Sequence, residues 1–352
     1  MPSFVVGVDG GTTKTIALVA DERGYILGAG RGGNSNWIGP DVEAPMQVVA
    51  KTVHEALGQA GLSGDNVAMG AFGLAGADWP EDYERRHVVL ERSGVARQLV
   101  IKNDTLVGWR AGTRDRFGVA IAAGTGSNTA IIPPDGKEWC YGYYVRYGGA
   151  RDMAYDAIYA VLEQEDGRGT STTLTEIVLS RLGYRKAEAL LRALYTHQLD
   201  SDKLLSLCPL VFDAAYDGDK VAAALIVKQG EALAEYATAG IRRYGMQDLA
   251  FDVVLSGSLF KGKGPLLIDT VTQAVHRVAP RTRIVRPRLE PAVGGVLLAY
   301  DALNLDVTDE MYGNLTQTVP GSTFFDTAGK GRDASDARRT TNDAEAFPCQ
   351  AQ

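Results

Sequence analysis

The sequence contains few of the residues that form disulfides or metal sites. There are only three cysteines and four histidines in 352 residues. Cys140, Cys208 and Cys349 lie far apart and form no Cys-x-x-Cys pair, which argues against a disulfide framework and against a zinc site. This cysteine usage is typical of the reducing cytoplasm, and we therefore expect a cytoplasmic protein.

An excess of positive charge and long apolar runs are also missing. The formal net charge is −7, so we expect neither nucleic acid nor an anionic membrane as a partner. No apolar stretch approaches the ~20 residues that span a bilayer, and the start MPSFVVGVDGG lacks the features of a secretion signal. The hydrophobic fraction of 45% and charged fraction of 22% are those of a globular protein, and its length suits two domains.

What the sequence does contain is an alternation of apolar strands and amphipathic helices, which predicts an α/β fold. The expected strands cover residues 4–8, 15–20, 25–30, 67–74, 98–102, 251–255 and 283–286. The expected helices cover residues 45–57, 82–93, 151–164, 174–181, 185–195, 202–215, 220–243, 266–278 and 291–303.

One pattern occurs twice. FVVGVDGGTTKTIALVADERGYI (4–26) and FGVAIAAGTGSNTAIIPPDGKEW (117–139) share the order of strand, Gly/Thr/Ser turn, strand and second turn. Glycine hairpins also arise by chance, but the shared order and spacing favour duplication of one unit, with each copy heading a domain. We therefore predict a first domain of residues 1–116 plus 291–306 and a second of residues 117–290. The polar stretch 307–352 is expected to be disordered.

The first turn, GVDGGTTKT, resembles a P-loop only superficially. Its spacing differs from GxxxxGK[ST], and a strand rather than a helix follows it. A hairpin can still bind phosphate, because glycines expose backbone N–H groups and allow close approach. A tight hairpin with a solvated lysine is the alternative interpretation. The candidate phosphate ligands are Gly10, Gly11, Thr12, Thr13 and Lys14, and Asp9 is a candidate for holding a hydrated Mg²⁺.

Two later loops have similar chemistry. The turn of the second copy carries Gly124, Thr125 and Gly126, and together the two hairpins would grip nucleotide phosphates from both sides. A third loop, with Gly257 and Ser258, follows the strand 251–255 and would adjoin a nucleoside. Taken alone, the third loop is equally consistent with a simple strand-to-helix turn.

The motifs DGGTTKT, NDT, AAGTGSNTAI, LSGSLF and PAVGGVLLAY, in this order, resemble the N-acetylglucosamine kinase and BadF/BadG/BcrA/BcrD-type ATPase family of the actin-like ATPase and sugar kinase superfamily. The resemblance implies two ribonuclease-H-like (actin-like ATPase) domains with ATP and Mg²⁺ in an interdomain nucleotide cleft. It also implies an ATP-dependent sugar or amino-sugar kinase that transfers the γ-phosphate to a sugar hydroxyl.

The resemblance assigns the acceptor side as well. Asp104 matches the catalytic base, which would take the proton of the attacking hydroxyl, and Asn103 precedes it. Asn-Asp-Thr is also a common helix cap, and both roles are compatible. Asn36 in the loop GGNSNW matches the sugar-binding asparagine, with an empty Gly/Asn turn as the alternative. Asp78 is a further candidate, although its surroundings equally suit a helix entry.

One stretch departs from the family pattern. Where its sugar kinases carry Gly-Asp-Glu-Gly-Ser, this sequence has Gly149-Ala150-Arg151-Asp152-Met153. Arg151 and Asp152 are therefore predicted acceptor contacts of altered character, because an arginine favours an anionic group or a salt bridge. The departure puts N-acetylglucosamine itself in doubt as the acceptor.

Two other functions compete with a kinase. Partner-activating ATPases of the same family share the nucleotide loops, but they hold an iron–sulfur cluster through paired cysteines, and the cysteines here are widely separated. A nucleotide-binding module without catalysis would lose the base, and Asp104 argues against it. We expect a small-molecule sugar as partner, and a homodimer is compatible with the sequence.

Overall fold

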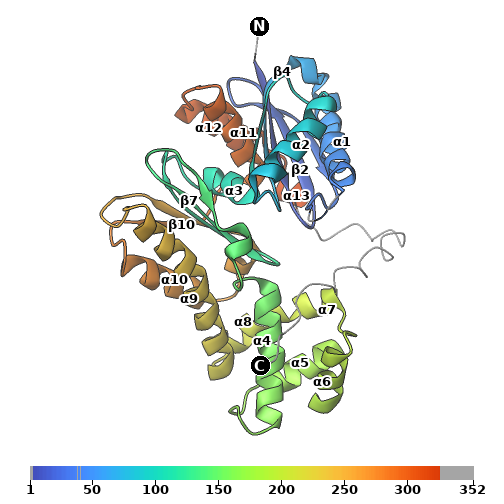
Figure 1. Ribbon diagram of the computed structural model, residues 1–352, viewed down its shortest axis with the longest axis vertical. Coiled ribbons are helices and arrows are strands. Elements are labelled where there is room, and N and C mark those ends of the chain that lie inside the picture. The colour runs from blue at the N-terminus through green and yellow to red at the C-terminus, as the bar shows by residue number, and fades with distance from the viewer. Residues whose placement is uncertain (1–2, 38, 40, 326–352) are drawn as a thin grey trace. The chain divides into compact units, whose positions relative to one another are not determined.

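The computed structural model describes residues 3–37, 39 and 41–325 (Figure 1). The chain divides into two units after Val319, and the strands all lie in the first. They are β1 (Phe4–Gly10), β2 (Thr15–Ala20), β3 (Ile26–Gly32), β4 (Val67–Leu74), β5 (Leu99–Asn103), β6 (Gly118–Ala123), β7 (Ser127–Ile132), β8 (Trp139–Cys140), β9 (Asp252–Ser256) and β10 (Arg283–Val285).

The helices lie between these strands and after them. They are α1 (Glu43–Ala60), α2 (Pro80–Arg92), α3 (Asp104–Gly112), α4 (Ala150–Glu165), α5 (Leu174–Leu182), α6 (Ala187–Tyr195), α7 (Ser201–Leu205), α8 (Leu207–Tyr216), α9 (Lys220–Arg243), α10 (Leu266–His276), α11 (Pro291–Ala302), α12 (Asp309–Thr318) and α13 (Ser322–Phe325). Short 3₁₀ turns are η1 (Gly64–Asn66), η2 (Gly142–Tyr144) and η3 (Ser258–Lys261).

The strands form two sheets with the same plan. The first has the order β3-β2-β1-β4-β5 and the second β8-β7-β6-β9-β10. In each, the first three strands of the chain pair antiparallel and the last two join in parallel. The repeat predicted from the sequence is therefore present in the fold, strand for strand, and the predicted α/β class is confirmed.

Helices cover both faces of the first sheet. Val6 and Val8 of β1 belong to a buried cluster that also contains Val49 and Val53 of α1. The alternate residue, Gly7, faces α11, which lies on the other side of the sheet from α1 (Figure 1). The two-residue period of a strand explains why valines and a glycine alternate here.

Helix α11 approaches its neighbours through glycine. A methyl group at Gly7 of β1 would lie 2.1 Å from the backbone nitrogen of Val296 in α11. One at Gly294 would lie 1.9 Å from the carbonyl oxygen of Val107 in α3, and one at Gly295 would lie 2.8 Å from the Val8 nitrogen. Helix α11 therefore contacts β1 and α3 backbone to backbone, which any larger residue would prevent.

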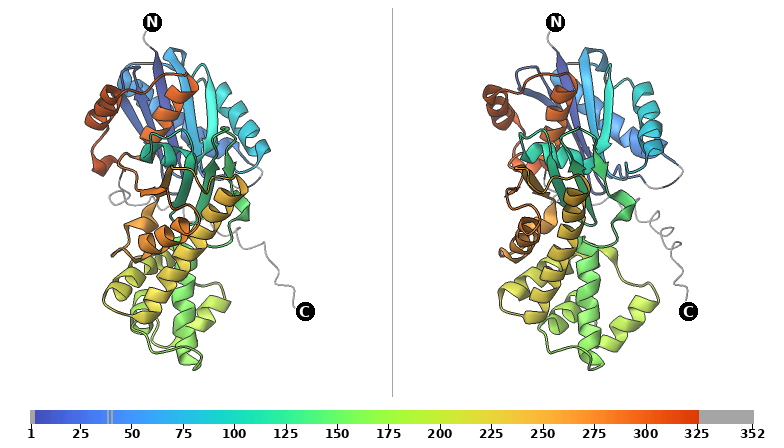
Figure 2. Two further views of the ribbon diagram at one scale, coloured as in Figure 1. Left: turned by 90° about the vertical axis from the view of Figure 1, so that its left-hand side faces the viewer. Right: turned by 60° about the vertical axis from the view of Figure 1, so that its left-hand side comes forward.

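The second sheet packs against the long helix α9, beside which α10 lies (Figure 2). The predicted limits of α9 are confirmed at both ends. The single helix predicted over 202–215 is wrong, because the structure has α7 and α8 with a break at Ser206. Pro209 has no N–H to donate to the Leu205 carbonyl, so the chain cannot continue as one regular helix.

Disorder from residue 307 is also a wrong prediction for residues 309–318, which form α12. Met311 and Leu315, four residues apart, are buried on one face of this otherwise polar helix. Asn314 Nδ2 donates to the Arg23 carbonyl at 2.8 Å, and Thr318 Oγ1 accepts from Ile26 N at 2.8 Å. Two apolar side chains and these bonds are enough to dock the helix. Residues 326–352 of the predicted tail lie outside the described part of the chain.

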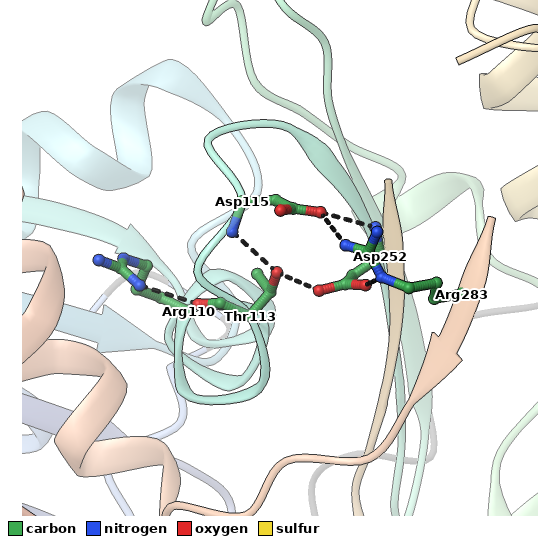
Figure 3. A network of polar contacts seen from close by, with 5 residues as sticks. All are labelled: Arg110, Thr113, Asp115, Asp252 and Arg283. Atoms are coloured by element: carbon green, nitrogen blue, oxygen red, sulfur yellow. Dashed lines mark hydrogen bonds and ion pairs between the residues drawn. The ribbon is translucent and has the colours of Figure 1, made fainter. Parts of the chain in front are cut away.

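Helix α3 connects the two sheets, and a polar network fixes its C-terminal end to the second one (Figure 3). Thr113 Oγ1 donates to Asp252 Oδ2 at 2.5 Å and accepts from Asp115 N at 3.0 Å. Arg283 then pairs with both Asp252 and Asp115, at 2.7 Å each. Arg110 Nη1 donates to the Thr113 carbonyl at 2.8 Å. The network joins α3, β9 and β10.

The same arginine ties α3 to the helices of the first sheet. Arg110 Nε donates to Asp301 of α11 at 2.7 Å, and Arg110 Nη1 donates to the Tyr312 hydroxyl of α12 at 2.7 Å. The end of α3 is thus anchored on both sides. Among the described residues, no helix is long and apolar enough to span a membrane.

Candidate functional site

The first glycine hairpin is a tight turn between β1 and β2. Gly11 N donates to the Lys14 carbonyl at 2.9 Å, and Thr12 and Thr13 are exposed at the tip. Below the tip, the Thr15 hydroxyl reaches the Gly33 carbonyl and the Ser35 hydroxyl. The hairpin is therefore held against the loop that follows β3.

Opposite charges meet at the base of this hairpin. Burial raises the pKa of Asp9 to about 6, an effect that Lys14 opposes and Glu290 reinforces. Burial lowers the pKa of Lys14, which Glu290 and Asp9 partly offset. Glu290, just before α11, was not predicted to belong here. No local motif marks it, since only the return of the chain to the first sheet brings it near.

The second and third loops lie against each other. Gly257 has φ +100°, and a methyl group there would lie 2.2 Å from the Ala123 carbonyl oxygen in the second hairpin. A methyl group at Gly124 would lie 3.9 Å from Ser258 Oγ. The charge of Lys261, in η3 directly after the third loop, contributes to the lowered pKa of Lys14. The third loop thus packs against the second, and Lys261, which follows it, lies within electrostatic range of Lys14 in the first.

The second hairpin also packs on the start of α4. Ala150 N donates to the Gly124 carbonyl at 2.8 Å, and Arg151 N donates to the Thr125 carbonyl at 3.1 Å. Asp152 Oδ2 accepts from Gly148 N at 3.0 Å and Gly149 N at 2.9 Å. That oxygen of the predicted acceptor contact is therefore occupied in capping its own helix, whereas the Arg151 side chain is exposed.

Asp104 is the first residue of α3, and Asn103 caps the helix. Asn103 Oδ1 accepts from Thr105 N at 2.9 Å, so the amide performs the capping role. Burial raises the pKa of Asp104 to about 7, with the charges of Asp9 and Asp78 adding to the effect. The predicted metal carboxylate, Asp9, and the predicted acceptor carboxylate, Asp78, therefore both act electrostatically on the predicted base.

Asp78 belongs to a polar cluster with two asparagines. Its Oδ1 accepts from Asn103 Nδ2 at 2.9 Å and from Asn128 Nδ2 at 3.5 Å. Asn128 Nδ2 also lies 3.2 Å from Asn103 Oδ1, and Gly142 N donates to Asn128 Oδ1 at 2.9 Å. Asn128 was not predicted as a site residue, although it directly follows the second hairpin's Gly-Thr-Gly-Ser and that position could have marked it.

An aromatic pair lies next to this cluster. Trp79, which follows Asp78, stacks on Tyr143 with ring centroids 5.4 Å apart and planes 20° apart. Trp79 is 50% exposed and Tyr143 49%, so the pair is partly open to solvent beside the cluster. Gly142, with φ +49°, allows this loop to approach, because a methyl group there would lie 2.7 Å from the Asp78 carboxyl carbon.

Asn36 lies in the loop after β3. Its backbone nitrogen donates to Asn34 Oδ1 at 2.8 Å. Its amide oxygen is buried and has no hydrogen-bond partner among the described residues. The next residue, Trp37, is buried. The predicted acceptor asparagine is therefore on a loop that packs into the protein.

The described residues contain no group of three or more His, Cys, Asp or Glu side chains able to hold a metal ion. Burial raises the pKa of both described cysteines, Cys140 and Cys208. Metal ligation by cysteine requires the thiolate, so a raised pKa disfavours it. These thiols are poor candidates for iron–sulfur ligands.

Comparison with known proteins identifies one matching family and related kinases. The model of the BadF/BadG/BcrA/BcrD ATPase family matches residues 6–299. A Dictyostelium discoideum relative named N-acetyl-D-glucosamine kinase is 27% identical over 312 residues, 84% of this chain and 98% of the relative. A Clostridium acetobutylicum relative named N-acetylmuramic acid/N-acetylglucosamine kinase is 25% identical over 300 residues, again 84% and 98%.

A solved structure shares the fold. The ROK family glucokinase of Streptomyces griseus, in complex with glucose and AMPPNP, superimposes with a TM-score of 0.54. The aligned region covers 85% of this chain and 100% of the glucokinase, and the two sequences are 16% identical over it. At this identity the likeness establishes the architecture of two related α/β units and nothing finer.

Proposed function

Because the chain belongs to the BadF/BadG/BcrA/BcrD ATPase family, we propose that it is an ATP-dependent sugar kinase that transfers the γ-phosphate of ATP to a sugar hydroxyl. One observation carries the proposal beyond the family. Burial and the charges of Asp9 and Asp78 raise the pKa of Asp104, at the start of α3, to about 7. A carboxyl with that pKa is matched to proton transfer near neutral pH.

The nucleotide is assigned to the three glycine loops. Backbone N–H groups of the hairpins would bind the phosphates, and the contact between Gly257 and Ala123 supports a shared binding surface. The residues assigned to ATP are Gly10, Gly11, Thr12, Thr13, Lys14, Gly124, Thr125, Gly126, Gly257 and Ser258. Closure of the two predicted domains around ATP belongs to the same proposal.

The residues at the first hairpin fit Mg²⁺. Asp9 is a carboxylate whose burial raises its pKa, and a nearby cation would stabilise its charged form. One carboxylate is sufficient, because Mg²⁺ in kinases keeps several waters and binds substrate phosphates. When bound, the ion would neutralise charge on the γ-phosphate. We assign Asp9 to hold it through water.

On the acceptor side, Asp104 takes the proton of the attacking hydroxyl. The sugar oxygen bonds to the γ-phosphorus, the bond to the β-phosphate oxygen breaks, and ADP leaves. Lys14 lies at the first hairpin, where its charge balances that of the phosphates. Asp78 and Asn36 hold the acceptor, and Asn103, which is buried, supports it by orienting Asp78 through their hydrogen bond.

The negative charges around Asp104 limit the kinds of sugar that could be the acceptor. The pKa of Asp78 is raised by burial and by the Asp82 charge, and Asp78 in turn raises that of Asp104. A further anion would be unfavourable in this field. We therefore infer that the acceptor is a neutral sugar or an amino sugar with a free ammonium group. Contacts from Arg151 and Asp152 stay predictions, since only the backbone of Arg151 is seen at the second hairpin.

The test is ADP release with a panel of acceptors. Glucosamine, N-acetylglucosamine, glucose and N-acetylmuramic acid cover the cationic, neutral and anionic cases. We expect release with at least one of the first three and the weakest release with the anionic sugar. ADP release that no sugar stimulates, together with bound iron in the purified protein, would favour the partner-activating ATPase instead.

Three further parts of the proposal await their own measurements. The domain limits 1–116 plus 291–306 and 117–290 are consistent with the packing of α11 on β1. A homodimer and a cytoplasmic location are predictions from sequence and family. Analytical ultracentrifugation tests for the homodimer, and cell fractionation tests the cytoplasmic location.

A further inference from the structure

Helix α2 carries a completely buried arginine. The exposed fraction of Arg86 is 0%, and it is the largest fully buried side chain among the described residues. Its neighbour Arg85 is exposed. Burying a guanidinium without a direct ion pair is costly, and no described carboxylate lies within 4 Å of it. A stability role alone would be better served by an apolar residue.

The contacts of Arg86 connect two loops. Its Nη2 donates to the Ala75 carbonyl at 3.0 Å and lies 3.4 Å from the Trp37 carbonyl. The guanidinium carbon lies 5.2 Å from the centroid of the Trp37 ring, over its face. Ala75 belongs to the turn after β4 that leads to Asp78, whereas Trp37 follows Asn36. One side chain thus joins the two segments that carry proposed acceptor contacts.

A glycine shows how closely these segments meet. Gly76 has φ +73°, and a methyl group there would lie 2.5 Å from the Trp37 carbonyl oxygen. It would also lie 2.9 Å from Asn36 Oδ1 and 3.3 Å from Arg86 Nη2. The amide oxygen of Asn36 and the guanidinium therefore lie against the same glycine.

Hydrogen-bonding capacity remains unused at this position. Arg86 Nε and Nη1, Asn36 Oδ1 and Trp37 Nε1 are all buried without a partner among the described residues. A guanidinium attracts an amide oxygen and repels an amide N–H₂. With its oxygen inward, Asn36 would present its N–H₂ group on the opposite side, where it would donate to an acceptor oxygen.

We propose that Arg86 is a positioning residue for acceptor binding: it holds the loop 33–37 and the turn 75–77 together and orients the Asn36 amide. The proposal rests on the sugar kinase function proposed above. Arg86 does not contact the reacting atoms and acts through Asn36 and Asp78. The charge of Asp78 also lies in the field of Arg86, which opposes the raised pKa of that carboxyl.

The first experiment is kinetic and uses the full-length protein with its best acceptor. Arg86→Met removes the donors while keeping an unbranched side chain, and Arg86→Lys keeps the charge but not the planar fork. We expect Arg86→Met to raise the acceptor KM roughly 10- to 100-fold, the usual effect of losing hydrogen bonds from a charged group. The ATP KM should stay within about twofold, because the nucleotide loops do not contact Arg86, and Arg86→Lys should be intermediate.

Arg85→Met is the matched control. It changes the same residue type one position away on the same helix, where the side chain is exposed, and we expect wild-type kinetics from it. If Arg86→Met left the acceptor KM unchanged, or raised both KM values equally, the positioning role would be wrong. If the Arg86→Met protein is unstable, Arg86→Lys becomes the deciding variant. An unchanged acceptor KM for Arg86→Lys would likewise contradict the positioning role.

A double-mutant cycle separates positioning from general structural support. In an Asn36→Ala background, Arg86→Met should raise the acceptor KM much less than it does alone, because the amide it orients is missing. Fully additive effects would overturn the proposed route through Asn36.

Hydrogen exchange gives a readout that does not depend on catalysis. Arg86→Met should speed exchange in residues 33–37 and 75–79 and leave residues 118–123 and 252–256, in β6 and β9 of the second sheet, unchanged. Uniform or absent changes would contradict the proposal. A wild-type protein with no acceptor-dependent ADP release would instead contradict the kinase function itself, and the acceptor role of Arg86 would fall with it.

Discussion

Thr113 donates a 2.5 Å hydrogen bond to Asp252 across 139 residues of sequence. Thr113 follows the helix that starts with the proposed base, and Asp252 begins the strand that ends at the third loop (Figure 3). Asp252 is 7% exposed and also pairs with Arg283. This bond thus helps to connect the segment between the two sheets to the strand that leads toward the proposed nucleotide site, beside the bond from Asp252 N to Asp115 Oδ2.

Thr113→Val should destabilise the protein. The change leaves Asp252 Oδ2 and Asp115 N each without one partner, which costs about 1–3 kcal/mol for buried polar groups. Differential scanning calorimetry should show a lower Tm. Thr316→Val is the control, because that exposed threonine bonds only within α12. Equal Tm values for the two variants would show that the Thr113 bond contributes nothing.

Asp104→Asn should remove most of the kinase activity while preserving nucleotide binding. The amide cannot accept the hydroxyl proton as a base, and loss of a general base typically lowers kcat by roughly 10²–10⁴. Steady-state kinetics and equilibrium binding of an ATP analogue measure the two effects separately. A variant that retained most of its kcat would rule out Asp104 as the base.

The same substitution should stabilise the fold at high pH. The pKa of Asp104 is raised from 3.8 to about 7 by burial and by Asp9 and Asp78, so between these values the unfolded chain binds fewer protons than the native one. Wild-type stability therefore falls as pH rises from about 4 to 7, by up to ~1.4 kcal/mol per pH unit from this group.

Asp104→Asn lacks that penalty. Its Tm should exceed that of the wild type at pH 8, and the difference should shrink as the pH is lowered toward 4. Thermal unfolding across this range gives the comparison. A difference that does not change with pH would mean that the Asp104 pKa is not raised in the folded protein.

Gly257→Ala should weaken ATP binding. At φ +100°, and with its methyl group 2.2 Å from the Ala123 carbonyl, alanine would displace the third loop from the second. Gly245→Ala is the control, since Gly245 has φ +65° but open space around it. We expect a higher ATP KM for Gly257→Ala only, measured at saturating acceptor, and equal KM values would contradict the contact between the loops.

The sequence predicted best where a local pattern decides the structure. The limits of α9 follow from helical spacing between Asp219, which caps it, and Arg243. The two hairpins could be predicted because the same sequence pattern occurs twice, and the structure has the same strand order in both sheets. The wrong prediction for residues 309–318 has a different origin: α12 is polar and folds only because β3 and the preceding turn offer partners such as Arg23 O.

The candidate site shows the same division. Glycine loops are visible in sequence because backbone geometry demands glycine. Asn128 was not predicted as a site residue, because its role depends on β7 placing it beside Asn103. Asp152 was predicted as an acceptor contact, but the sequence does not show that its carboxylate caps its own helix. Arg86 had no signal at all, because in the sequence it is one of two adjacent arginines and only packing distinguishes them.

The glycines of α11 have a consequence for how the site keeps its dimensions. Helix α11 touches the strand that carries Asp9 and the helix that begins at Asp104, in both cases through main-chain atoms. A contact between backbones has no side chain that substitution could lengthen or shorten. The spacing between the two carboxylates is therefore insulated from sequence drift at the surrounding positions. Acceptor preference can be re-engineered at the loops while Gly7, Gly294 and Gly295 keep the catalytic frame unchanged.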